Sequence, residues 1–224
     1  MEFLYQSCDR AWWTIPAVAK YAATEWHQRY HPLTMTYTII QPPFTLKFRE
    51  MSKKELKDYF EWFQNILPQR LDELTKAVKQ TPGYGTWQPD LTPTSLDLLG
   101  DWFVTQVETR LRTQDELQEI ESRSTYPIEI PREELTNRTF SLAMDVGMYL
   151  SQVFLKKHST LQWDQPFGNK KFVDYGQPVL AGFGAAPFNP VWLLVTLAYG
   201  VVSKRKTGKS LRELYDIWSK LILK

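Results

Sequence analysis

Apolar residues recur at helical spacing through most of the chain, and this period predicts a largely helical protein. The clearest stripe follows Ser52-Lys-Lys-Glu55, a capping box in which the serine hydroxyl accepts an N–H three residues on and the glutamate reaches back. Pro68 falls inside this stripe and is expected to kink or split the helix near Leu67. The predicted helices span residues 14–30, 52–78, about 92 or 94 to 111, 113–123, about 132 or 136 to 157, 190–202 and 210–222.

Runs of β-branched residues predict a few short strands. Residues 34–40 read TMTYTII and stand between prolines, so they favour a strand that residues 46–48 extend or pair with. Residues 126–130 are a second short candidate. Residues 171–174 and 179–183 stand beside glycine and proline turns and favour a hairpin.

Together these elements predict an α+β fold, a predominantly α-helical single domain with one small antiparallel sheet or hairpin. A chain of 224 residues is long enough to bury a sizeable core. We expect one globular domain over residues 1–224. If it divides, the two sub-units are 1–125, which is helical, and 126–224, which is α+β.

Two predicted helices share a sub-pattern centred on Trp62 and Trp102, which lie 40 residues apart. In each, a phenylalanine follows the tryptophan directly, and an arginine lies seven residues after that phenylalanine. A helical-repeat scaffold is one interpretation, but a solenoid needs at least three copies. Two antiparallel helices that pack their aromatic residues together explain the pattern better, with Trp102 in the core.

The charge balance narrows the classes of function. The chain has 27 Lys+Arg and 25 Asp+Glu, a net charge of +2, which excludes the strong positive field that most nucleic-acid binders carry. Hydrophobic residues make up 43% and charged residues 23%, ordinary proportions that exclude disorder, collagen and coiled-coil fibres.

Cysteine usage and apolar run lengths indicate the compartment. Cys8 is the single cysteine, so no internal disulfide forms, and this fits the reducing cytosol. The first residues have no basic n-region and no long apolar stretch, so they do not resemble a signal peptide. The most apolar run, Val191–Val202, is shorter than the roughly 20 residues of a spanning helix and predicts a helix buried in the core. We expect a cytoplasmic protein with no membrane partner.

Segments that resemble ligand motifs each lack a part of the motif. His27 and His31 have the spacing of a zinc-binding helix, but Gln28 stands where that motif has glutamate, so we expect neither metal nor cofactor. Gly208-Lys209-Ser210 resembles the end of a P-loop, but Ser203 stands where the first glycine belongs. We interpret it as a turn and a helix cap.

Two further features keep alternative functions open. Asp145 lies at the edge of the stripe of its helix. A half-buried acid is a candidate general base. An ion pair with a structural partner such as Arg70 or Arg110 would account for a half-buried Asp145 equally well. The loop Lys204–Lys209 carries four cations, which suit either phosphate contact or a solvated turn between helices.

The region most typical of a binding site is 161–189, where aromatic and charged side chains stand among glycine and proline turns. Binding residues concentrate on loops held by a rigid scaffold, and aromatic anchors are typical of protein interfaces. The alternative is a structural hairpin that caps the helices, with Trp163 in the core. The candidate partner-binding residues are Trp163, Lys170, Lys171, Asp174, Tyr175, Gln177 and Asn189.

Short motifs in the second half of the chain are similar to those of a family of small uncharacterised cytosolic proteins of Gram-positive bacteria. They are Asp145-Val-Gly-Met-Tyr149, Leu161-Gln-Trp163, Gly176-Gln-Pro-Val-Leu180, Asn189-Pro190 and Leu214-Tyr-Asp-Ile-Trp218. The family has no established activity, so the resemblance assigns no catalytic residue. Some members resemble immunity-type binding proteins.

These observations favour a non-enzymatic cytosolic interaction protein, with an immunity-like inhibitor that occludes the surface of a protein partner as its specific form. The mechanism would be aromatic anchoring with a polar rim on the 161–189 loops. The alternatives are a small-molecule enzyme with an acid–base site near Asp145 and a weak nucleic-acid binder that uses the 204–209 loop. A deep pocket containing Asp145 would favour the enzyme, and a flat aromatic patch the binding protein.

Overall fold

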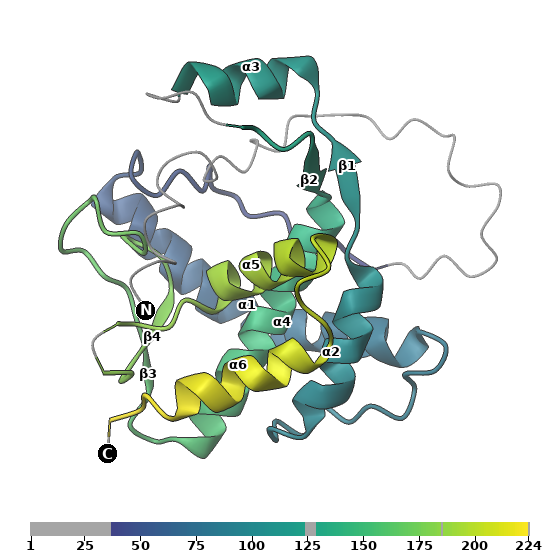
Figure 1. The fold of residues 1–224 in the computed structure, drawn as a ribbon. Helices are drawn as coiled ribbons and strands as arrows, with labels where there is room; N and C mark the ends of the chain where they lie inside the picture. The colour runs from purple at the N-terminus through teal and green to yellow at the C-terminus, as the bar shows by residue number, and fades with distance from the viewer. Residues whose placement is uncertain (1–36, 124–128, 185, 224) are drawn as a thin grey trace.

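The computed structural model describes residues 37–123, 129–184 and 186–223 (Figure 1). This part of the chain confirms the predicted fold class: it is a mostly helical α+β domain, with two small antiparallel sheets where we expected one. The helix predicted over residues 14–30 lies outside the described residues. The helices are α1 (Lys53–Gln80), α2 (Ser95–Gln106), α3 (Gln114–Arg123), α4 (Asn137–Lys157), α5 (Pro190–Val202) and α6 (Lys209–Ser219).

Helix α4 lies at the centre of the domain. Thr136 caps its N-terminus by accepting a hydrogen bond from the backbone N–H of Thr139. Fourteen of its 21 residues are buried, because α1, α2, α5 and α6 all pack against it. Helix α5 approaches closely at Gly147, where a Cβ would stand 2.9 Å from the carbonyl oxygen of Pro190. One core therefore contains residues from both halves of the chain, from Leu74 to Tyr215.

Helix α1 begins at the predicted capping box but is not interrupted by its proline. The Ser52 hydroxyl accepts from the N–H of Glu55, and the Glu55 carboxylate accepts from the N–H of Ser52. Of the predicted kink or split at Pro68, the split is wrong, since the helix runs through the proline to Gln80. Pro68 lies on the exposed face, so water can satisfy the carbonyl that loses its partner, while the buried stripe holds the helix on both sides.

Helices α2 and α6 pack against each other through two glycines. A Cβ at Gly208 would stand 2.6 Å from the Cα of Asp101, and Gly100 lies against the backbone of Gly208. The interpretation of Gly208-Lys209-Ser210 as a turn that opens a helix is correct, whereas the expected helix cap is not formed by a side chain. Helix α6 begins one residue earlier than predicted, with Gly208 at its N-cap and no capping hydrogen bond from a side chain.

The two sheets are each a pair of three-residue strands. Strand β1 (Thr109–Leu111) pairs with β2 (Glu133–Leu135), and β3 (Gln162–Asp164) pairs with β4 (Val179–Ala181). The predicted pairing of residues 171–174 with the later strand is therefore wrong. Residues 171–174 form turns, and the strand that pairs with β4 is β3, close to the C-terminal end of α4.

The strand predicted over residues 34–40 is also absent in its described part, residues 37–40. Residues 37–40 form no strand and pair with none in the described part of the chain, and residues 48–50 form a turn that follows Leu46, which has a positive φ of 55°. Residues 34–36 and most of 126–130 lie outside the described residues. Side chains of α1 and α4, rather than a neighbouring strand, satisfy the backbone N–H groups of Thr38 and Ile40.

Strands β1 and β2 project from the helical body together with α3 (Figure 1). Arg110 joins these elements, because it bonds to Glu116 of α3 at 2.6 Å and to Glu134 of β2 at 2.7 Å. Thr113 and Glu116 form the predicted capping box of α3. The hydrogen bond from Arg110 lowers the pKa of Glu116 to about 2.

The echoed tryptophans lie in different environments. Trp102 is fully buried, as predicted, and its indole N–H donates to the hydroxyl of Thr81 at 2.8 Å. Trp62 is half-buried and packs against Phe44 and Tyr59 in a separate cluster. The prediction that these two helices pack their aromatic residues together is therefore wrong, and the similarity of pattern reflects two separate apolar faces.

Candidate functional site

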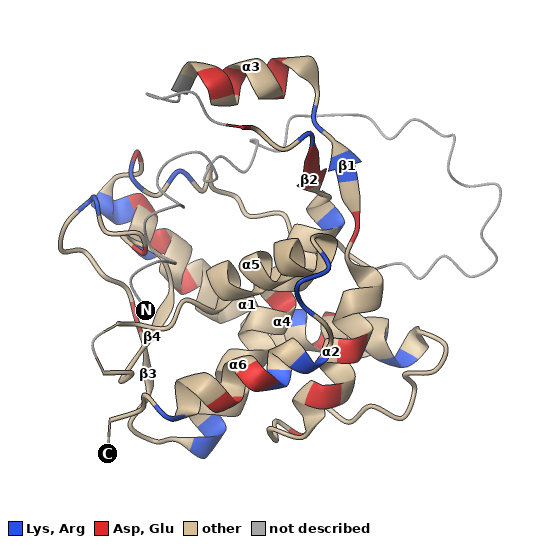
Figure 2. Ribbon diagram, viewed as in Figure 1, with Lys and Arg blue, Asp and Glu red and all other residues tan. Residues whose placement is uncertain are grey.

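Helix α5 carries no charged residue along its whole length, and Figure 2 shows it as an unbroken tan ribbon. Such a helix is expected to be buried on all sides. Here only one side is buried, with Leu194, Leu197 and Ala198 in the core. The other side is half-buried and lines a groove, so the expectation that Val191–Val202 is a core helix is correct for one face only.

The groove has a volume of about 1170 Å³ and three walls. One wall is the stripe along α5, and another is a shorter stripe at the N-terminal half of α4. The third is the segment 39–48. Its main apolar lining residues are Ile39, Ile40, Pro42, Pro43, Phe44, Leu46, Phe48, Met51, Tyr59, Phe140, Met144, Pro178, Val191, Trp192, Val195, Tyr199 and Val202.

The two ends of the groove differ in charge. At the N-terminal end of α5 the lining includes Glu55, whose carboxylate is already engaged in the capping box. At the other end the lining includes Arg132, Arg205 and Glu133. The paired strands β1 and β2 lie at this end, where Tyr199, one turn before the end of α5, interacts with Glu134 and Leu135 of β2.

A buried polar cluster lies at the N-terminal end of α5. The Asn189 side chain accepts from the N–H of Trp192 and so caps the helix, and its amide donates to Asp174 at 2.8 Å and to Gln177 at 3.0 Å. Burial raises the pKa of Asp174, and the hydrogen bond from Asn189 acts in the opposite direction. Gln177 and Asn189 line the groove, so this cluster fixes both the start of α5 and the polar end of the groove floor.

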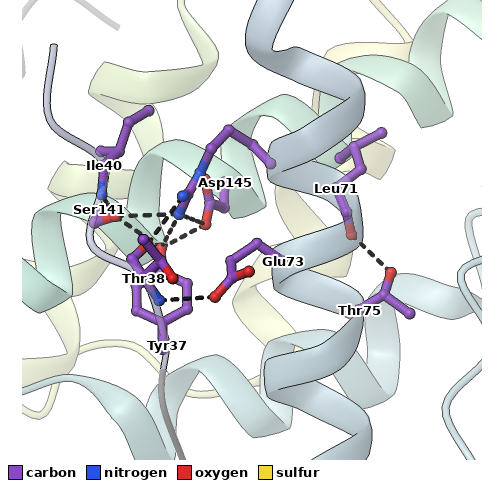
Figure 3. Close-up of polar contacts among 9 residues, drawn as sticks. Tyr37, Thr38, Ile40, Leu71, Glu73, Thr75, Ser141 and Asp145 are labelled. Carbon is purple, nitrogen blue, oxygen red and sulfur yellow. Dashed lines mark hydrogen bonds and ion pairs between the residues drawn. The ribbon is translucent and has the colours of Figure 1, made fainter.

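The segment 37–40 is held in place by a buried ion pair between α1 and α4 (Figure 3). The Arg70 guanidinium donates to both carboxylate oxygens of Asp145, at 2.8 and 2.7 Å. It also donates to the carbonyl of Thr38 at 2.9 Å and to the hydroxyl oxygen of Tyr37 at 2.8 Å. We call Tyr37, Arg70, Ser141 and Asp145 the buried clamp.

The remaining hydrogen bonds of the buried clamp join it to Ile40, a residue that lines the groove. The Tyr37 hydroxyl donates to Asp145, and Ser141 bonds to the Tyr37 hydroxyl at 2.8 Å. Ser141 also accepts from the backbone N–H of Ile40 at 2.9 Å. Because Ile40 and Ser141 both line the groove, the clamp sets the position of this wall.

The electrostatics of the clamp are those of a paired, desolvated carboxylate. Burial raises the pKa of Asp145, while hydrogen bonds from Arg70 and Tyr37 lower it. Burial and the neighbouring Asp145 raise the pKa of Tyr37, so its hydroxyl keeps its proton and donates it. Asp145 is fully buried and is not among the groove-lining residues, so its chemistry is accounted for by the structural partner Arg70.

The structure separates the seven candidate partner-binding residues. Gln177 and Asn189 line the groove, and Asp174 lies behind them. The other four lie elsewhere: Trp163 is half-buried against Phe63, Tyr175 is buried beside Phe167, and Lys170 and Lys171 are exposed on the loop.

Sequence reasoning missed most of the groove. The proline-rich run Gln41-Pro-Pro-Phe44 was not recognised as a wall, and the α5 face was expected in the core. The sequence offered no local signal for the open face, because a helix without a charge is also what burial on all sides predicts.

The basic loop after α5 is a well-bonded helix end. The N–H groups of Arg205 and Lys206 both donate to the carbonyl of Gly200, and Lys204 has a positive φ of 57°. Lys204, Arg205, Lys206 and Lys209 are exposed. Figure 2 shows this blue segment directly after the uncharged helix.

The comparisons with known proteins return no relative. No family model matches the chain, and neither the curated proteins nor the solved structures contain a match. In the described ranges no helix is long and apolar enough to cross a membrane. His, Cys, Asp and Glu side chains of the same residues form no group of three able to hold a metal ion, while His27 and His31 lie outside them.

Proposed function

We propose that this protein is a non-enzymatic interaction protein whose groove along α5 receives an amphipathic helix of a protein partner. The observation that carries the proposal is the uncharged face of α5, which runs the length of the groove and is left half-buried. Apolar faces of this kind mark interaction sites in folded proteins. An immunity-like inhibitor, which blocks its partner by covering it, belongs to this class.

The dimensions favour a helix over a small molecule. Small-molecule sites usually have volumes of roughly 300–1,000 Å³, and the groove exceeds that range at about 1170 Å³. The α5 stripe from Val191 to Ser203 is about 18 Å long at 1.5 Å per residue. A helix of similar length can place apolar residues at i, i+3, i+4 and i+7 along such a groove.

The acid–base alternative has less support. Asp145 lies outside the groove, and its two oxygens already accept bonds from Arg70 and Tyr37. A general base must reach the proton that it abstracts. The nucleic-acid alternative rests on the 204–209 loop, where no aromatic residue is present to stack on bases.

A matched pair of variants tests the groove. The probe is a fluorescein-labelled 16-residue amphipathic helical peptide with one leucine stripe, titrated against the full chain by anisotropy. Thr196→Asp places a charge on the exposed, groove-lining position of α5. Thr105→Asp places the same charge on an exposed position of α2, outside the groove. The two positions are matched, because at both the threonine hydroxyl donates to a carbonyl of its own helix.

We expect the peptide to bind the wild-type chain and the Thr105→Asp variant equally, and the Thr196→Asp variant about tenfold more weakly. Failure of the peptide to bind, or equal binding to the Thr196→Asp variant, would overturn the proposal. Benzoylphenylalanine at position 196 identifies other occupants. A photo-crosslink to residues 1–36 of the same chain, to a second copy or to a lipid would assign the groove to that occupant instead.

A further inference from the structure

We infer that the helix received by the groove carries an acidic residue at one end, which lies against Arg132 and Arg205 at the C-terminal end of α5. This inference rests on the proposed function and specifies the chemistry of the partner. It comes from the uneven distribution of charge along a groove whose body is apolar.

Both arginines are available for such a contact. Arg132 and Arg205 are exposed, and no carboxylate of the described residues forms an ion pair with either of them. The Arg205 Nε donates to the Ser203 hydroxyl at 2.9 Å, which leaves its two terminal nitrogens for a ligand. An arginine at the rim of an apolar groove is a typical partner for a carboxylate, which its planar fork can bind through two bonds.

The neighbouring charges strengthen the field at this end. Lys204 and Lys206 are exposed on either side of Arg205. Of the described residues that line this end, Glu133 is the one carboxylate, and it already accepts from the Thr109 hydroxyl at 3.1 Å. Among the described lining residues, the net charge at this end is therefore positive, whereas Glu55 is the charged one at the opposite end.

The opposite charges also predict an orientation. A helix with its acidic residue at the far end would place that carboxylate toward Glu55 and leave both arginines unmatched. Like-charge contacts are disfavoured and unlike contacts favoured, so the acidic end determines which way the helix lies in the groove. Because these side chains are exposed, the effect is modest in affinity and sensitive to salt.

The test compares three peptides with the same leucine stripe, whose terminal residue pair is Glu-Glu, Gln-Gln or Lys-Lys. They are titrated against the full chain by anisotropy at low salt and again at high salt. Three proteins are compared: the wild type, the double variant Arg132→Gln/Arg205→Gln, and the double variant Lys76→Gln/Lys220→Gln. The last variant removes the same charge from two exposed lysines outside the groove.

We expect the Glu-Glu peptide to bind the wild-type chain about fivefold more tightly than the Gln-Gln peptide at low salt, and the Lys-Lys peptide to bind least tightly. The preference should disappear in the double arginine variant and at high salt, and persist in the lysine variant. If all three peptides bind equally well to the wild type, the charge inference is wrong and the proposed groove function stands. If none binds, the proposed function itself has failed.

Discussion

Replacing Arg70 by methionine removes one half of the buried clamp and leaves the other half in the core. The Arg70 side chain is 6% exposed and that of Asp145 is 0% exposed, so water cannot replace the lost guanidinium. Removing one partner of a buried ion pair typically costs about 3–5 kcal/mol, because it leaves an uncompensated charge. We expect a loss of this size in the free energy of unfolding of Arg70→Met.

The double variant Arg70→Met/Asp145→Leu separates the buried charge from the loss of packing. Replacing both partners by apolar residues removes the uncompensated carboxylate, so the double variant should be more stable than Arg70→Met alone. Urea unfolding at pH 7.5, followed by tryptophan fluorescence, measures the four proteins of the cycle: wild type, Arg70→Met, Asp145→Leu and the double variant. Losses that simply add in the double variant, or a cost below about 1 kcal/mol for Arg70→Met, would refute the clamp as described.

The same variant gives a pH dependence with a defined sign. Burial raises the pKa of Asp145, and Arg70 is the largest influence that lowers it. Without Arg70 the pKa of the folded state rises further above that of the unfolded chain, so the folded state binds a proton more tightly. The stability of Arg70→Met relative to wild type should therefore recover as the pH falls from 8 toward 5. A stability gap that widens on acidification would contradict this explanation.

Other predictions follow from single positions. Trp102→Ala should cost about 3–5 kcal/mol in urea unfolding, because the indole is fully buried; a cost near zero would place it at the surface. Gly208→Ala should cost about 1–3 kcal/mol because its Cβ would meet the Asp101 backbone, whereas Gly168→Ala, with open space around it, should cost far less. Dialysis against a chelator should leave the melting temperature unchanged, and a fall that zinc restores would reveal a metal site. Duplex DNA should bind at physiological salt with a dissociation constant above about 10 μM, and submicromolar binding lost on neutralising the 204–209 loop would contradict this.

Elements with local signals could be predicted from the sequence. Capping boxes at Ser52 and Thr113, the Asn189-Pro190 start of α5 and the Thr136 cap of α4 all depend on residues within one helical turn. Their helices begin within one or two residues of the predicted positions, which for α4 is the later of the two predicted starts, 132 and 136. The burial of Trp102 was predictable for the same reason, since helical spacing alone defines its apolar face.

The wrong predictions concern elements whose form depends on distant residues. The β-branched pattern of residues 37–40 favours a strand, but the chain there bonds to Glu73 of α1 and Ser141 of α4 instead of to another strand. Likewise β4 pairs with β3 and not with residues 171–174, because the partner is chosen by the packing around α4. A kink or split at Pro68 is expected from local chemistry, and the helix does not split, because its buried face is packed on both sides of the proline.

The sequence by itself determined the helical class, the helix starts and the existence of an uncharged helix at 190–202, because each depends on spacing along one segment. Only the tertiary structure decided that one face of this helix is left open, since that depends on where α4 and residues 39–48 lie beside it. It also decided the role of Asp145. A carboxylate 75 residues from its arginine has no local signal, and its pairing follows only from the packing of α1 against α4.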